Sequence, residues 1–101
     1  MATRLELQKK LEEMLGKENV YYQPPNSLSM EYPAIVYSKS DVKGIHANNT
    51  KYLKNTQYTL TVIDRIPDNP VIDKLLDLPY CSYDRSYKAN NLNHDVLILY
   101  Y

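Results

Sequence analysis

The sequence is poor in the residues that mark several common classes of protein. Its 101 residues include one cysteine, two glycines, and neither phenylalanine nor tryptophan. A single cysteine excludes an internal disulfide and the paired-cysteine spacing of zinc sites. Two isolated glycines exclude a glycine-rich phosphate-binding loop. The sequence has no signal peptide and no long apolar run, so we expect a protein that is made and used in a cytoplasm and does not enter a membrane.

The chain also lacks an excess of either charge. Twelve lysines and arginines balance twelve aspartates and glutamates, so no overall field attracts nucleic acid or an anionic membrane. An apolar fraction of 44% argues against disorder, and the length suits a single domain with one core. The aromatic residues are eleven tyrosines, which suit half-buried core positions or protein–protein contacts. A compositional bias of the source genome explains them equally well.

The hydrophobic pattern predicts two helices. Between Thr3 and Gly16, leucines recur at helical spacing, Thr3 and Glu6 have the spacing of a capping box, and Gly16 is a natural stop. Asn69 with the following proline favours the start of a short second helix, which Pro79 is expected to stop.

Stretches that alternate in polarity or are rich in β-branched and aromatic residues predict strands. They span residues 19–23, 34–39, 55–65, 81–87 and 94–101. The order αβββαββ predicts an α+β fold, a largely antiparallel twisted sheet packed by an N-terminal helix and a short second helix. The last strand is apolar on both faces, which predicts a place inside the sheet or beneath a partner. One domain then covers residues 1–101, with a polar arm at about residues 40–55.

The C-terminal segment holds residues that could form a thiol hydrolase site, namely Cys81, His94 and Asp95. A hairpin with its turn at residues 88–93 puts His94 beside the turn and Cys81 at the far end. At about 3.3 Å per residue, roughly 20 Å then separates them, beyond the reach of a catalytic dyad. His46, His94 and the scattered carboxylates have no spacing typical of a metal site.

The other acidic residues also have structural explanations. Asp84 and Arg85 are neighbours in a strand, so they should point to opposite faces of the sheet. Asp64 and Asp68 weakly match the acidic spacing of metal-dependent nucleases. However, Asp64 ends a strand, and Asp68 precedes a helix start, where the helix dipole favours a carboxylate. We therefore expect no catalytic residue, no metal and no cofactor.

The polar arm is the one locally basic stretch of the sequence. It carries Lys43, Lys51 and Lys54, follows Lys39, and has Asp41 as its only acid. Such a stretch could contact a phosphate backbone or an acidic partner surface. It could equally be a solvated hairpin arm whose charges keep the protein in solution.

Several stretches together resemble the small tail-terminator (tail-completion) proteins of long-tailed bacteriophages, in the type found in phages and prophages of Gram-positive bacteria. The resemblance covers roughly Leu5 to Tyr101 and rests on the order and spacing of its parts. These are "VYYQPP", "YPAIVY", "TVID" followed by "PD" and a short helix, "DRSY", "NLNHD" and a β-strand C-terminus. It implies an α+β domain with helices against a twisted sheet, and no enzyme activity.

The resemblance further implies a structural virion protein that is assembled in the bacterial cytoplasm and located at the tail–neck junction. Such proteins form a homo-oligomeric ring, typically a hexamer, on the head-proximal end of the tail tube. The ring stops polymerisation of the tail tube protein and presents a docking surface for the head-completion or stopper protein. DNA passes through its lumen without sequence-specific binding.

The family supplies no catalytic motif, so the candidate site residues are interface residues. The candidates for contact with the tube or the lumen are Lys43, His46, Lys51 and Lys54. The candidates for packing at a subunit boundary are Tyr100 and Tyr101. The two tyrosines could instead close the core of their own subunit. The alternative functions are a head-completion or stopper protein of the neck, a small metal-dependent nuclease and a monomeric adaptor.

Overall fold

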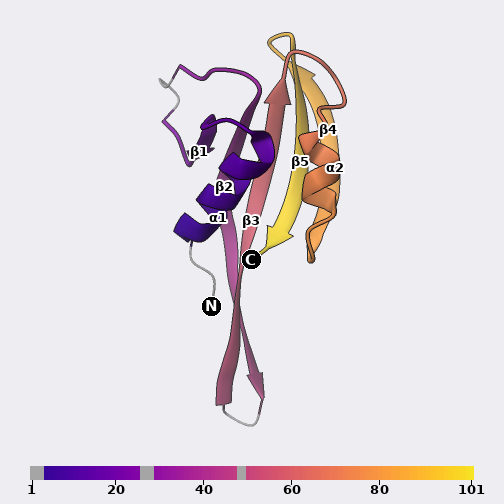
Figure 1. The fold of residues 1–101 in the computed structure, drawn as a ribbon. Coiled ribbons are helices and arrows are strands. Elements are labelled where there is room, and N and C mark those ends of the chain that lie inside the picture. The colour runs from indigo at the N-terminus through magenta and orange to yellow at the C-terminus, as the bar shows by residue number, and fades with distance from the viewer. Residues whose placement is uncertain (1–3, 26–28, 48–49) are drawn as a thin grey trace.

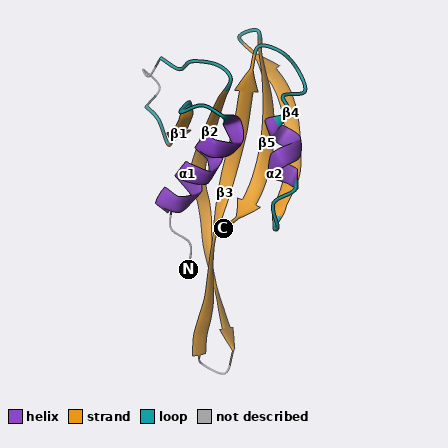
Figure 2. Ribbon diagram, in the orientation of Figure 1, coloured by secondary structure: helices purple, strands orange, loops and turns teal. Residues whose placement is uncertain are grey.

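Two helices pack on one face of a five-stranded sheet (Figures 1 and 2). The computed structural model describes residues 4–25, 29–47 and 50–101, without the side chains of residues 41–47 and 50–55. The predicted α+β class and the order αβββαββ are confirmed. The elements are α1 (Arg4–Leu15), β1 (Val20–Tyr22), β2 (Ala34–Ala47), β3 (Thr50–Asp64), α2 (Val71–Leu76), β4 (Cys81–Ala89) and β5 (Leu92–Tyr100).

The strand order in the sheet is β1-β2-β3-β5-β4. Only β1 and β2 run parallel, and the other neighbours are antiparallel. The last strand, β5, therefore lies between β3 and β4, which confirms the inside position predicted from its two apolar faces. The helices cover the sheet face that carries Leu60 and Leu97, and both side chains are fully buried. Burial of each such leucine contributes about 1.5–3 kcal/mol to folding.

Two strand boundaries predicted from the sequence are wrong. β2 does not end at Lys39 but continues to Ala47, and β3 begins at Thr50 rather than at Asn55. Residues 41–47 pair with residues 50–57 as an antiparallel ribbon. Backbone pairing alone makes such a ribbon, so it needs no alternation of apolar side chains and left no strand pattern to detect.

The turn between β4 and β5 is shorter than the predicted loop at residues 88–93. Only Asn90 and Asn91 separate the strands, and both have positive φ, 53° and 61°. A two-residue turn with this geometry matches the right-handed twist of the flanking strands, and asparagine tolerates it better than most residues.

A polar network anchors α1 to the sheet. Gln8 donates to the Val20 carbonyl at 2.9 Å, and the Tyr37 hydroxyl donates to the Gln8 amide oxygen. The Arg4 guanidinium lies 4.3 Å from the centre of the Tyr22 ring, a cation–π contact. The predicted capping residue Thr3 lies outside the described residues. These contacts give the buried Tyr37 hydroxyl the partner that a buried polar group requires.

The second helix is capped as predicted. The Asn69 side-chain oxygen accepts from the Val71 amide at 2.9 Å, although the helix itself begins after Pro70. It ends at Leu76, before Pro79. Within the described ranges, neither helix is long and apolar enough to cross a membrane.

Alkaline pH should destabilise this fold through two buried tyrosines. Burial raises the pKa of Tyr37 and of Tyr58, and the positive charge of Arg4 offsets part of each rise. Tyrosines of the unfolded chain ionise at about pH 10, so the folded state holds these two protons more tightly than the unfolded state does. The contribution of these two tyrosines to the free energy of unfolding is therefore fully present below about pH 10 and is lost as the pH rises further. Urea unfolding across this range should show the decline.

Tyr37→Phe removes one of these two tyrosine ionisations, so the stability of this variant should fall less steeply above about pH 10. Tyr80→Phe, at a side chain that is 79% exposed, should keep the wild-type slope. Equal slopes for all three proteins would contradict the assignment to buried tyrosines.

Candidate functional site

The ribbon (residues 41–47 and 50–55) gathers the four basic interface candidates in one projection. His46 lies opposite Lys51. Gly44 lies opposite Lys54, one residue along from the pair of Lys43 and Asn55. Figure 1 shows the ribbon leaving the sheet at the end where the C-terminus lies. At about 3.3 Å per residue, its strands reach roughly 20 Å beyond the sheet. The side chains of these candidates lie outside the described residues, so their contacts stay a prediction.

Side-chain hydrogen bonds fix the root of the ribbon. The register shifts between Lys39 and Asp41, a bulge that bends a strand and increases its twist. At this shift the Ser40 hydroxyl donates to the Gln57 carbonyl at 3.0 Å, and the Gln57 amide donates to the Tyr100 hydroxyl at 2.9 Å. The direction in which the ribbon leaves the domain is therefore tied to the end of β5.

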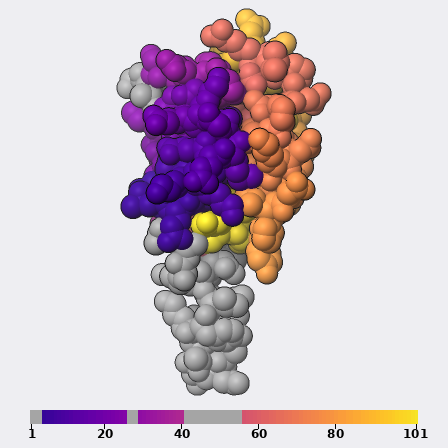
Figure 3. Space-filling view, viewed as in Figure 1, coloured from indigo at the N-terminus to yellow at the C-terminus, as the bar shows by residue number. Residues whose placement is uncertain are grey.

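The two C-terminal tyrosine candidates lie beside this root. They line a largely apolar pocket of about 220 Å³ between α1 and the α2–β4 connection, together with Lys10, Leu78, Pro79, Tyr80 and Leu99. Figure 3 shows C-terminal atoms exposed in this region, between the surfaces of α1 and of α2 with β4. Tyr101 packs against the subunit's own core, in line with the alternative interpretation. A contact of Tyr100 or Tyr101 with another subunit stays a prediction.

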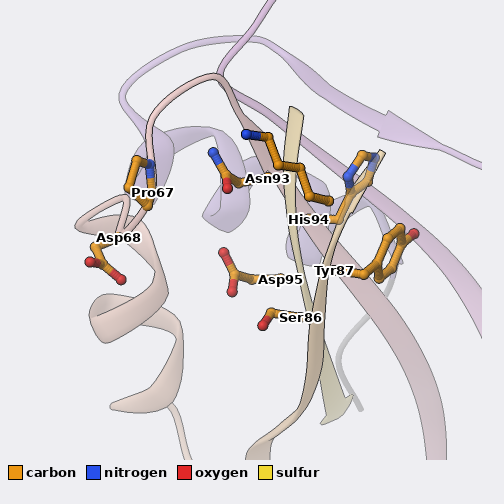
Figure 4. Close-up of a pocket in the computed structure, with 8 residues that line it drawn as sticks. Pro67, Asp68, Ser86, Tyr87, Asn93, His94 and Asp95 are labelled. Carbon is orange, nitrogen blue, oxygen red and sulfur yellow. The ribbon is translucent and has the colours of Figure 1, made fainter. Parts of the chain in front are cut away.

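A second pocket, of about 310 Å³, opens at the other end of the β4–β5 hairpin (Figure 4). Asp95 and Ser86 point toward the loop that carries Asp68, whereas Tyr87 and His94 lie on the opposite side of the two strands. The Asp95 carboxylate accepts a hydrogen bond from the Tyr83 hydroxyl at 2.7 Å, on the side facing that loop. The pocket therefore places Ser86 opposite Asp95 on one face, and the Asp95 carboxylate is already hydrogen bonded to Tyr83.

The arrangement of β4 and β5 rules out the thiol dyad, as predicted. Cys81 pairs with Leu99, whereas His94 pairs with Tyr87 at the opposite end of β4. The His94 ring stacks on Tyr87 with ring centres 4.6 Å apart. Burial raises the pKa of the Cys81 thiol, which disfavours the reactive thiolate.

The prediction that Asp84 and Arg85 point to opposite faces is wrong. Their side chains form an ion pair with 2.6 Å between Arg85 Nη1 and Asp84 Oδ2. The register of β4 shifts between Tyr83 and Arg85, so Asp84 is the extra residue of a β-bulge and the alternation of faces breaks there. The pair is exposed to solvent and contributes at most about 1 kcal/mol.

The carboxylate of Asp64 is engaged within its own turn. Asp64 is 9% exposed, and its two oxygens accept from the Arg65 amide at 2.7 Å and the Asn69 side-chain amide at 2.6 Å. Asp68 is exposed. Across the described residues, no group of three or more His, Cys, Asp or Glu could hold a metal ion. The pair Asp64 and Asn69 therefore closes the β3–α2 turn.

The two edges of the sheet differ in a way that the sequence did not reveal. The β1 edge is three residues long, its Val20 carbonyl accepts from Gln8, and prolines follow the strand. The β4 edge is nine residues long and exposed along almost its whole length. Tyr80, just before β4, is 79% exposed, and Tyr83 and Tyr87 within the strand are 45% and 47% exposed. Sequence reasoning missed this edge because a strand's neighbours depend on the order of the sheet.

The comparisons with known proteins give no relative from which to assign the site. No protein-family model and no curated protein matches the sequence. The site is thus defined by the geometry above: a projecting ribbon, the pocket at its root and an open sheet edge.

Proposed function

We propose that the protein is a structural virion protein, a tail terminator of a long-tailed bacteriophage. It forms a homo-oligomeric ring, which we propose to be a hexamer, on the head-proximal end of the tail tube. The ring stops polymerisation of the tube protein and offers a docking surface to the head-completion or stopper protein. The resemblance over Leu5 to Tyr101 supports this function, and the fold has the class that the resemblance implies.

The single observation that carries the proposal is the ribbon. An isolated two-stranded hairpin is marginally stable in water, and three or more strands or a packing surface are needed for stability. In the described chain, residues 43–47 and 50–55 pair only with each other. Such a projection gains most when a neighbouring molecule contacts it, which suits an assembly protein.

The geometry also supplies the two kinds of surface that a ring requires. A closed ring is built from heterologous contacts, in which one surface of a subunit meets a different surface of the next. The ribbon and the β4 edge are two such surfaces on different elements. The basic sequence of the ribbon, with Lys43, Lys51 and Lys54, suits contact with the tube or with DNA in the lumen.

Deletion of the gene in its phage or prophage, with electron microscopy of the lysate, tests the proposal. We expect overlong, irregular tails beside unattached DNA-filled heads, because tube polymerisation then has no stop. Tails of normal length that fail to join heads would instead place the protein on the head side of the neck, as a completion or stopper protein. Intact virions would overturn both functions.

A further inference from the structure

The open edge of β4 presents backbone groups that no strand of the described chain pairs. The Tyr100 amide donates to the Tyr80 carbonyl at 3.1 Å, which makes these two residues a hydrogen-bonded pair of the ladder. Hydrogen-bonded and non-hydrogen-bonded pairs alternate along antiparallel strands. Cys81 and Tyr83 lie one and three residues after Tyr80, so they occupy non-hydrogen-bonded positions opposite β5. Both therefore direct their amide and carbonyl groups away from β5.

The same alternation holds on the other side of the β4 bulge. A two-residue turn makes its flanking residues, Ala89 and Leu92, a hydrogen-bonded pair. Lys88 and Ser86, at odd steps from Ala89, consequently direct their backbone groups outward. Ser86 is exposed and lies in the regular part of the strand, so an added strand meets no bulge there.

Natural sheets block their edges with short strands, prolines, charges or bulges. The β1 edge is short and is followed by Pro24 and Pro25, whereas β4 has only its bulge and two positively charged residues. Three exposed tyrosines lie at this edge, Tyr80 just before β4 and Tyr83 and Tyr87 within it, and tyrosine is enriched in the binding hot spots of protein interfaces. The β4 edge thus has both the backbone and the side chains of a strand-addition site.

We infer that β4 of one subunit pairs with a ribbon strand of a second copy of this chain. The ribbon is the other part of the described chain with long strands and open edges, and it gains a third strand from the contact. Pairing of β4 with a ribbon is heterologous and can close a ring, whereas pairing of β4 with β4 gives only a two-fold dimer. The inference identifies the subunit contact of the ring and so rests on the proposed function.

Proline at position 86 tests the added strand. Ser86→Pro removes an outward amide without removing a bond to β5, and prolines are tolerated on such edge positions. Ser86→Ala is the matched control, because it loses the hydroxyl but keeps the amide. By sedimentation of purified protein, we expect Ser86→Pro to self-associate at least about tenfold more weakly than the wild type, and Ser86→Ala to match the wild type. Wild-type association by Ser86→Pro would overturn the inference, as would a wild type that stays monomeric at every concentration.

Cross-linking identifies the occupant even if the proline variant fails to fold. In a Cys81→Ser background, Ser86→Cys and Lys43→Cys are made as separate proteins, one with a size tag, mixed and treated with a bis-maleimide. We expect a cross-linked product that contains one copy of each. Cross-linking of Ser86→Cys with itself would show that β4 pairs with β4 and would overturn the ribbon as occupant, and absence of any product would overturn the contact.

The cross-linking experiment tests the subunit contact, and the gene deletion tests the terminator function, so each can be contradicted without the other. Overlong tails on gene deletion without the mixed product would leave the terminator function standing and remove the contact. A mixed product with intact virions on deletion would leave the strand pairing standing and remove the terminator function.

Discussion

Removal of the ribbon should abolish assembly while the domain stays folded. Lys43 and Asn55 are directly opposed, so deletion of residues 44–54 and insertion of Asn-Gly between them leaves a short hairpin. The described core, around Leu60 and Leu97, lies between the helices and the sheet, away from this cut. Loop length has a weak effect on stability, so the free energy of unfolding should change by no more than about 1 kcal/mol. Urea unfolding and sedimentation measure the two effects separately.

A variant that keeps the ribbon but loses its charge is the matched control. Replacement of Lys43, Lys51 and Lys54 by glutamine retains the backbone that pairs and removes the basic groups. We expect this variant to associate in solution as the wild type does and to fail only where contact with tube or DNA is needed. A shortened protein that still assembles would contradict the role of the ribbon. One that unfolds would show that the ribbon stabilises the domain.

Local chemistry predicted most of the elements correctly. The leucines of α1 and the alternation around Leu60 each report which side chains face the core, and burial confirms both, with Leu7 and Leu11 fully buried. Asn69 acts as a cap because its side chain bonds an amide two residues away. These features need only a few neighbouring residues, so the sequence pattern is sufficient to find them.

Features that depend on distant neighbours could not be predicted in this way. The eleven tyrosines look alike in composition, yet Tyr37 and Tyr58 are buried while Tyr80, Tyr83 and Tyr87 are exposed along β4. Which of them is exposed depends on the position of β4 at the sheet edge, and that follows from strand order. The bulge at Asp84 likewise changes the face of later residues and is invisible to a strict two-residue period.

The candidate site, too, was predictable only in the features that depend on neighbouring residues in the sequence. Its basic residues were visible in the sequence as a charged stretch, but their distribution over two paired strands, with His46 opposite Lys51, was not. The open β4 edge was not anticipated. One signal was available in the sequence. A strand that is apolar on both faces belongs inside the sheet, so the long neighbouring strand without apolar alternation is left for the edge.

Loss of the Asp64 carboxylate should destabilise the protein strongly. Asp64→Ala removes the acceptor for the Arg65 amide and for the Asn69 side chain, and leaves these donors without their partner. Hydrogen bonds to a charged group contribute about 1.5–3 kcal/mol each, so we expect a loss of roughly 3 kcal/mol. For a domain of this size that lowers the melting temperature by about 12–24 °C. Thermal and urea unfolding measure it.

Two further variants distinguish an Asp64 carboxylate that holds the β3–α2 turn closed from one that belongs to a metal site. Asp64→Asn keeps one acceptor for the Arg65 amide but places its own amide against that of Asn69, so its effect should be intermediate. Asp84→Ala, in an exposed ion pair, should cost less than about 1 kcal/mol. A metal-dependent nuclease predicts the opposite pattern, since removal of a carboxylate from an acidic metal site relieves repulsion and Mg²⁺ stabilises the intact protein. An Asp64→Ala variant as stable as the wild type, with a wild type stabilised by Mg²⁺, would therefore favour the nuclease over a carboxylate that holds the β3–α2 turn closed.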